Sequence, residues 1–189
     1  MASSDKKKIS VEEAGKILVD FSTDRNDLKM ILGQLPENPE FSLVTVEYEM
    51  QLLKILSIGW GISYFMPEGV EKEKLAAEFW NLINLLSKDI SLSISSIEKE
   101  IDYFEIIKKR LDQYLKVLQH SSKISGPEPD SVSDPASDLV SMIGPKFAEI
   151  CGYEDNVFVI ISGAKIFSLA LSGLREYLES ISLVIPDNQ

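Results

Sequence analysis

Two apolar segments decide the fold that this sequence predicts: ILSIGWGISYFM at residues 55–66 and VFVIISGAKIFSLALSGL at residues 157–174. Both segments place small residues four apart, such as Ser57 with Gly61 and Ala164 with Ser168. Small side chains at that spacing share one helix face and let a neighbouring backbone approach closely. The two segments therefore predict closely packed helices.

Helical patterns on both sides of these segments extend that prediction to the whole chain. Residues 42–66 form one long pattern whose second half is apolar on nearly every side, which is typical of a central helix. Residues 70–118 carry a bundle seam, and the serine-rich stretch 87–96 favours two helices there over a single one. We therefore expect an all-α fold: a single-domain antiparallel helical bundle of five to seven helices with a central apolar helix.

The expected boundaries follow from caps and breakers. We expect a disordered tail over residues 1–8, a single α-helical domain over residues 9–186 and a flexible loop over residues 121–134, which is rich in serine and proline. Ser10, with Glu13 three residues later, predicts the start of the first helix. Asp155 or Asn156 is expected to cap a last helix that runs toward Leu183.

The charge of the chain limits its partners. Thirty acidic against nineteen basic side chains give a formal net charge of −11. Such a surface repels nucleic acid and anionic membranes. The acidic excess lies in residues 9–66 and 123–189 and suits either a basic protein partner or solubility alone.

The expected location is cytoplasmic. A lone Cys151 excludes an internal disulfide, and the first ten residues carry a basic run with no apolar stretch behind it. Residues 157–174 are the most apolar stretch, but Lys165 lies in their middle. A lysine there costs about 2.5–3.5 kcal/mol on membrane insertion. We therefore interpret this segment as a buried helix and expect no stable membrane insertion.

No residue pattern predicts catalysis, a metal or a cofactor. The single histidine, His120, lacks the acidic residue three positions earlier that di-metal bundles need. Glu68 with Glu71, and Glu98 with its neighbours Asp102 and Glu105, are interpreted as solvated faces, as are Glu47 and Glu49. Cys151 is interpreted as a small core residue among acidic neighbours, because a thiolate needs an electropositive pocket. We therefore expect no catalytic residues, no metal ligands and no cofactor.

Aromatic residues near the glycines support a ligand hypothesis beside the simpler interpretation of core packing. An apolar ligand would use the room that the glycines leave between the helices at 55–66 and 157–174. The candidate ligand-binding residues are Gly59, Trp60, Gly61, Tyr64, Gly163 and Phe167.

The favoured function is a non-catalytic protein–protein interaction module, either inhibitor- or immunity-like or chaperone-like. Homodimerisation through the long middle helices is a natural form of it. The main alternative is a binder of a small apolar ligand between residues 55–66 and 157–174. An enzyme that uses scattered carboxylates and a protein that enters membranes after a conformational change also stay open.

Overall fold

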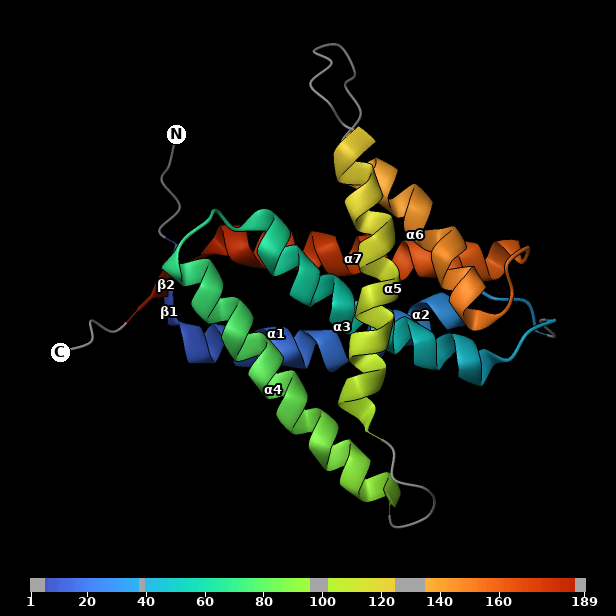
Figure 1. Ribbon diagram of the computed structural model, residues 1–189, viewed down its shortest axis with the longest axis horizontal. Coiled ribbons are helices and arrows are strands. Elements are labelled where there is room, and N and C mark those ends of the chain that lie inside the picture. Colours follow the sequence, from blue (N-terminus) through green and yellow to red (C-terminus); the bar gives the residue numbers. More distant parts are fainter. Residues whose placement is uncertain (1–5, 38–39, 96–101, 125–134, 186–189) are drawn as a thin grey trace. The chain divides into compact units, whose positions relative to one another are not determined.

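The computed structural model describes residues 6–37, 40–95, 102–124 and 135–185 (Figure 1). Within these ranges the regular secondary structure is helical except for one short pair of strands, so the all-α prediction is confirmed. The elements are β1 (Lys7–Ser10), α1 (Val11–Thr23), α2 (Asn26–Leu32), α3 (Leu43–Phe65), α4 (Val70–Ser95), α5 (Tyr103–Ile124), α6 (Pro135–Cys151), α7 (Val157–Ser180) and β2 (Ile181–Val184). The antiparallel arrangement of the bundle stays a prediction.

The chain divides into two compact units, each assembled from distant segments. The first unit comprises Met1–Asp24, Ile55–Glu105 and Ala170–Gln189, and the second comprises Arg25–Lys54 and Ile106–Leu169. Helices α3, α5 and α7 each contribute residues to both units. The expectation of one domain over residues 9–186 stays a prediction.

The first unit is built around α1 packed on α4, the blue and green helices of Figure 1. The Ser10 hydroxyl caps α1 by accepting the Glu13 N–H at 3.2 Å, as predicted. A Cβ on Gly15 of α1 would lie 2.6 Å from Glu78 Cγ of α4, so the absent side chain lets these helices approach closely. Phe79 of α4 is fully buried in this unit.

A two-stranded parallel sheet joins both ends of the first unit and corrects two expectations. Lys7 and Lys8 belong to β1, although the sequence analysis placed them in a disordered tail. The last helix ends at Ser180 rather than near Leu183, because Ile181–Val184 pair with Lys7–Ser10 instead. Pairing between residues so distant in sequence leaves no local periodicity to detect. Residues 1–5 of the expected tail lie outside the described part of the chain.

The second unit contains all of α2, the first half of α3, most of α5, all of α6 and the first half of α7. A Cβ on Gly144 of α6 would lie 2.7 Å from the Ile160 carbonyl oxygen of α7, so these two helices pack with their backbones close together. Gly152 ends α6 in the left-handed region, at φ +77°, and the Tyr153 N–H donates to the Ala148 carbonyl at 2.8 Å. Asn156 then caps α7, as one of the two predicted residues.

One predicted helix is confirmed closely in its bounds, and a second prediction is confirmed in part. The long helix expected over residues 42–66 is α3, and every residue from Leu52 to Gly59 is buried. The seam over residues 70–118 is divided between α4 and α5, so the prediction of two helices is confirmed, but the serine-rich stretch expected to separate them belongs to α4 up to Ser95. Asp102 Oδ1 caps α5 by accepting the Glu105 N–H at 3.1 Å. Of the predicted loop at residues 121–134, the first four residues belong to α5 and residues 125–134 lie outside the described part.

Candidate interaction surface

In the first unit, neighbouring side chains occupy the space beside the glycines of the predicted ligand pocket. A Cβ on Gly59 would lie 2.2 Å from Trp80 Cζ2, and one on Gly61 would lie 2.5 Å from Leu174 Cδ2. Trp60 stacks on Tyr64 with ring centroids 4.7 Å apart, and the Tyr64 side chain is exposed. The room beside these glycines is therefore used for helix packing.

The two remaining pocket residues, Gly163 and Phe167, lie on α7 in the second unit, and they too are used for packing. A Cβ on Gly163 would lie 2.5 Å from the Phe147 side chain, and Phe167 is buried. The six candidates are thus divided between two units, four in the first and two in the second. A ligand site that uses all of them stays a prediction.

A buried ion pair in the second unit was missed by the sequence analysis. Glu49 of α3, interpreted there as a surface residue, is only 4% exposed. Arg110 of α5 donates from Nε to Glu49 Oε2 at 2.8 Å and from Nη2 to Glu49 Oε1 at 2.6 Å. This two-bond geometry is the strongest form of the arginine–carboxylate pair. The interpretation of Glu49 as solvated is therefore wrong.

Two further ionisable side chains lie near this pair, and both are kept neutral. Burial raises the pKa of the Tyr114 hydroxyl well above its ordinary value, and the nearby Glu49 carboxylate adds to this effect. Burial and then Glu49 raise the pKa of the Cys151 thiol to about 12. Cys151 is buried, which confirms its interpretation as a core residue. A thiol with so high a pKa is a poor nucleophile at neutral pH.

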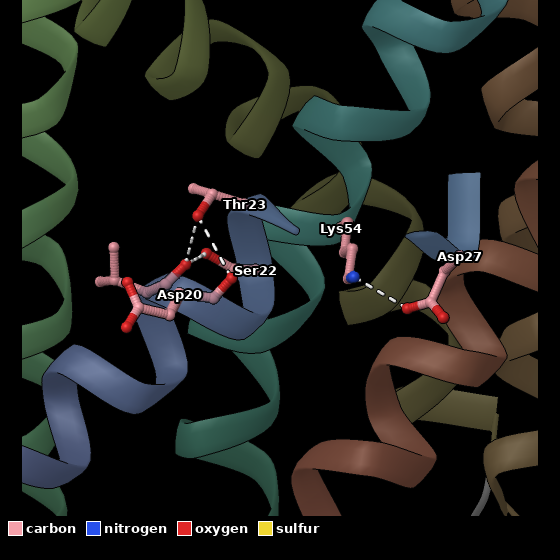
Figure 2. Close-up of polar contacts among 6 residues, drawn as sticks. Asp20, Ser22, Thr23, Asp27 and Lys54 are labelled. Atoms are coloured by element: carbon pink, nitrogen blue, oxygen red, sulfur yellow. Dashed lines mark hydrogen bonds and ion pairs between the residues drawn. The ribbon is translucent and has the colours of Figure 1, made fainter. Parts of the chain in front are cut away.

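A second buried charge lies at Lys54 of α3, whose side chain is 0% exposed. Its Nζ donates to Asp27 Oδ2 of α2 at 2.8 Å, as Figure 2 shows. Figure 2 also shows the Ser22 and Thr23 hydroxyls in the last turn of α1, where both donate to the Val19 carbonyl oxygen at 2.9 Å. These hydroxyl bonds are ordinary back-bonds within a helix and point to no ligand.

The two buried charged side chains have partners that serve the fold. Lys54 and Glu49 each bind an opposite charge through a direct hydrogen bond. Among the described residues, no group of three or more His, Cys, Asp or Glu side chains lies together as metal ligands would. Glu98 and the His120 side chain are outside the described part of the chain. These interior ion pairs therefore stabilise the fold.

The first half of α7 carries an exposed apolar stripe. Phe158, Ile161, Lys165 and Leu169 follow one another at steps of three and four residues, so they lie on one helix face. The exposed fractions are 61% for Val157, 48% for Phe158, 44% for Ile161 and 38% for Leu169. Lys165, at the middle of the stripe, donates to the neutral amide oxygen of Gln34 at 2.8 Å. We call these five residues of α7 the α7 face.

The α7 face lies on a helix of strongly apolar composition. Of the described helices, α7 is long and apolar enough to cross a membrane by length and composition, a property that core helices of soluble proteins share. The opposite side of this part of α7 is buried, as Val159, Ile166 and Phe167 show, so the helix has one covered face and one exposed face. A contiguous apolar face left exposed is a typical mark of an interaction site.

Comparison of the chain with protein-family models, with curated proteins and with solved structures finds no match.

Proposed function

We propose that this chain is a non-catalytic protein–protein interaction module that binds its partner through the α7 face. The observation that carries the proposal is the exposure of Val157, Phe158 and Ile161 on α7, the one described helix that is long and apolar enough to cross a membrane. Covering such side chains with a protein surface gains about 25 cal/mol for each Å² of apolar area removed from water. The inhibitor- or immunity-like and chaperone-like forms both use a surface of this kind.

Charge supports a protein rather than a membrane on this face. Lys165 lies in the middle of the stripe, where insertion into hydrocarbon costs about 2.5–3.5 kcal/mol. The formal net charge of −11 also opposes approach to anionic lipid. The same net charge attracts a basic protein, which is the partner class that we propose together with a cytoplasmic location.

The alternative of an apolar ligand between residues 55–66 and 157–174 has less support. The spaces beside Gly59 and Gly163 are occupied by Trp80 and Phe147. A ligand there would first have to displace a large aromatic ring from packed contacts. The interaction module needs no such rearrangement, because its proposed binding residues are already exposed.

The test compares three forms of the full chain: wild type, Ile161→Asp on the α7 face, and Leu92→Asp as a matched control on the exposed surface of α4. Proteins captured by the wild type are purified, and their affinities for all three forms are measured by calorimetry. We expect a basic protein that binds wild type and Leu92→Asp alike and loses at least tenfold in affinity for Ile161→Asp. Equal affinity for all three forms would refute the α7 face as the binding site.

A further inference from the structure

The starts of α3 and α7 are held together by Tyr153, in the turn between α6 and α7. The Tyr153 hydroxyl accepts the Ser42 N–H at 2.9 Å, and its ring lies against the Phe41 ring with centroids 5.9 Å apart. The Ser42 hydroxyl in turn caps α3 by accepting the Thr45 N–H at 3.2 Å. All four residues belong to the second unit, so both helix starts lie at one end of it. We call this end the Tyr153 end.

The Tyr153 end exposes apolar side chains of both helices. Val44, in the first turn of α3, is 78% exposed, and Leu43 before it is also exposed. Val157 and Phe158, in the first turn of α7, are exposed as well and begin the α7 face. The apolar surface that a partner could cover is therefore not limited to α7.

The charge carried by the two segments of the Tyr153 end is entirely negative. Residues 34–44 and 153–161 contain four acidic residues and no lysine or arginine: Glu37, Glu40, Glu154 and Asp155. All four are exposed, and none of them takes part in an ion pair among the described residues. Lys146, on α6 just before this turn, is already bound to Glu149 at 2.6 Å. Exposed apolar side chains are thus accompanied by unneutralised carboxylates.

We propose that the α7 face and the start of α3 bind a basic amphipathic helix of a partner protein. This inference rests on the proposed function, because it names the partner segment that the same face takes. The exposed residues of α7 recur at steps of three and four, which is the spacing that a second helix packs against. The carboxylates of the Tyr153 end select a cationic helix, since opposite charges across an interface discriminate between partners and speed their approach.

Lys165 determines where the positive charges of the partner lie. It follows Val157 by eight residues, which is about 12 Å along α7. Its Nζ is bound to the neutral Gln34 amide oxygen at 2.8 Å, a contact that leaves its charge in place. A basic residue of the partner is therefore disfavoured beside Lys165 and favoured at the Tyr153 end.

Fluorescence anisotropy of labelled synthetic peptides, added to the full chain, tests the partner class. The probe is a helix of about 14 residues with leucine on one face and lysine on the other, and the comparison peptide has glutamate in place of every lysine. We expect the wild type to bind the lysine probe at least about tenfold more tightly than the glutamate peptide. Equal binding of the two peptides would overturn the inference.

Neutral substitutions test the apolar contacts without changing the charge. Phe158→Ser and Val44→Ser should each weaken binding of the lysine probe, by about tenfold for Phe158→Ser, whereas the control Leu92→Ser on α4 should bind like wild type. Unchanged binding by Phe158→Ser would overturn the inference. So would wild-type chain that self-associates without any peptide and stops doing so in Phe158→Ser, because a second copy would then be the occupant.

Charge neutralisation separates the site from the net charge of the chain. Glu154→Gln with Asp155→Asn removes two charges just before α7, and the control Glu71→Gln with Glu73→Gln removes two from the first turn of α4. The first double variant should weaken binding of the lysine probe about fivefold and reduce its salt dependence between about 0.01 M and about 0.15 M, whereas the control should match wild type.

Equal effects of the two double variants would show that the probe responds to net charge alone and would overturn the inference. Its failure is distinguishable from failure of the proposed function. If the lysine probe shows no preference for the wild type but the captured partner still requires Ile161, the basic helix is wrong and the α7 face remains the binding site.

Discussion

The buried pair of Glu49 and Arg110 gives the sharpest prediction about stability. In Arg110→Met, the Glu49 carboxylate loses both of its arginine hydrogen bonds while its residue is only 4% exposed. Removing one partner of a buried ion pair costs about 3–5 kcal/mol, because the other charge stays buried without compensation. We therefore expect Arg110→Met to lower the free energy of unfolding by about 4 kcal/mol.

The reverse substitution should cost less. In Glu49→Gln, the Arg110 side chain is 21% exposed and keeps its hydrogen bond to Gln113. Losing one charge-assisted interaction of this kind costs about 1.5–3 kcal/mol. The double variant Glu49→Leu with Arg110→Met should lie within about 1 kcal/mol of wild type, because apolar replacement of a buried pair is often neutral or stabilising.

Urea unfolding followed by circular dichroism and by tryptophan fluorescence measures all four proteins. The order of stability should be wild type and double variant first, then Glu49→Gln, then Arg110→Met. A loss of less than about 0.5 kcal/mol in Arg110→Met, the range of ordinary surface substitutions, would show that Glu49 is solvated and would refute the reasoning. A double variant as unstable as Arg110→Met would equally contradict it.

Three further predictions concern single residues. Gly61→Leu should lower the melting temperature through overpacking of about 1–3 kcal/mol, since a Cβ there lies 2.5 Å from Leu174 Cδ2; an unchanged melting temperature would be inconsistent with that contact. Ser10→Ala should cost about 1 kcal/mol in urea unfolding through loss of the α1 cap, and no loss would mean that the cap is dispensable. Burial raises the pKa of the Cys151 thiol from its ordinary 9.0 to about 12, so the folded protein holds this proton more tightly than the unfolded chain does. The contribution of the thiol to the free energy of unfolding is therefore intact below pH 9.0 and is lost as the pH rises toward about 12. The free energy of unfolding should fall across that range, and Cys151→Ala should make the fall shallower; an identical slope in both proteins would contradict the assignment.

The long apolar helix was predictable because its signal is local. Its apolar pattern runs without a turn residue from Ser42 to Met66, and α3 spans Leu43–Phe65. The division of the seam into α4 and α5 was predicted from the serine-rich stretch 87–96, but α4 continues through that stretch to Ser95, because serines such as Ser87 bind back to the preceding turn, here the Ile83 carbonyl at 2.7 Å, without ending the helix. Patterns of this kind depend on neighbours within one or two turns.

The features that the sequence analysis missed all depend on residues far apart in the chain. The strand register joins Lys7 to Ile181, and the buried pair joins Glu49 to Arg110. One usable signal existed for the second buried charge: Lys54 interrupts an otherwise apolar stretch of α3, between Leu53 and Ile55. A lysine at a core position predicts an acidic partner but does not say which one.

The exposure of the α7 face was also beyond local reasoning. Apolar residues predominate in α7, and a helix of that composition is expected to be covered on all sides. Which side stays exposed depends on how many neighbouring helices the fold supplies. Ile161 and Phe167 are both apolar, yet Ile161 is 44% exposed and Phe167 is 1% exposed.

Native mass spectrometry of the purified wild type and of Ile161→Asp, at low and at moderate salt, tests the central claim most directly. We expect the wild type to carry the mass of a second protein chain, either a copy of itself or a partner. Ile161→Asp should appear as a single chain. A wild type that carries only the mass of a lipid or other small molecule, or an Ile161→Asp variant that keeps the same protein adduct, would contradict the assignment of the α7 face to protein binding.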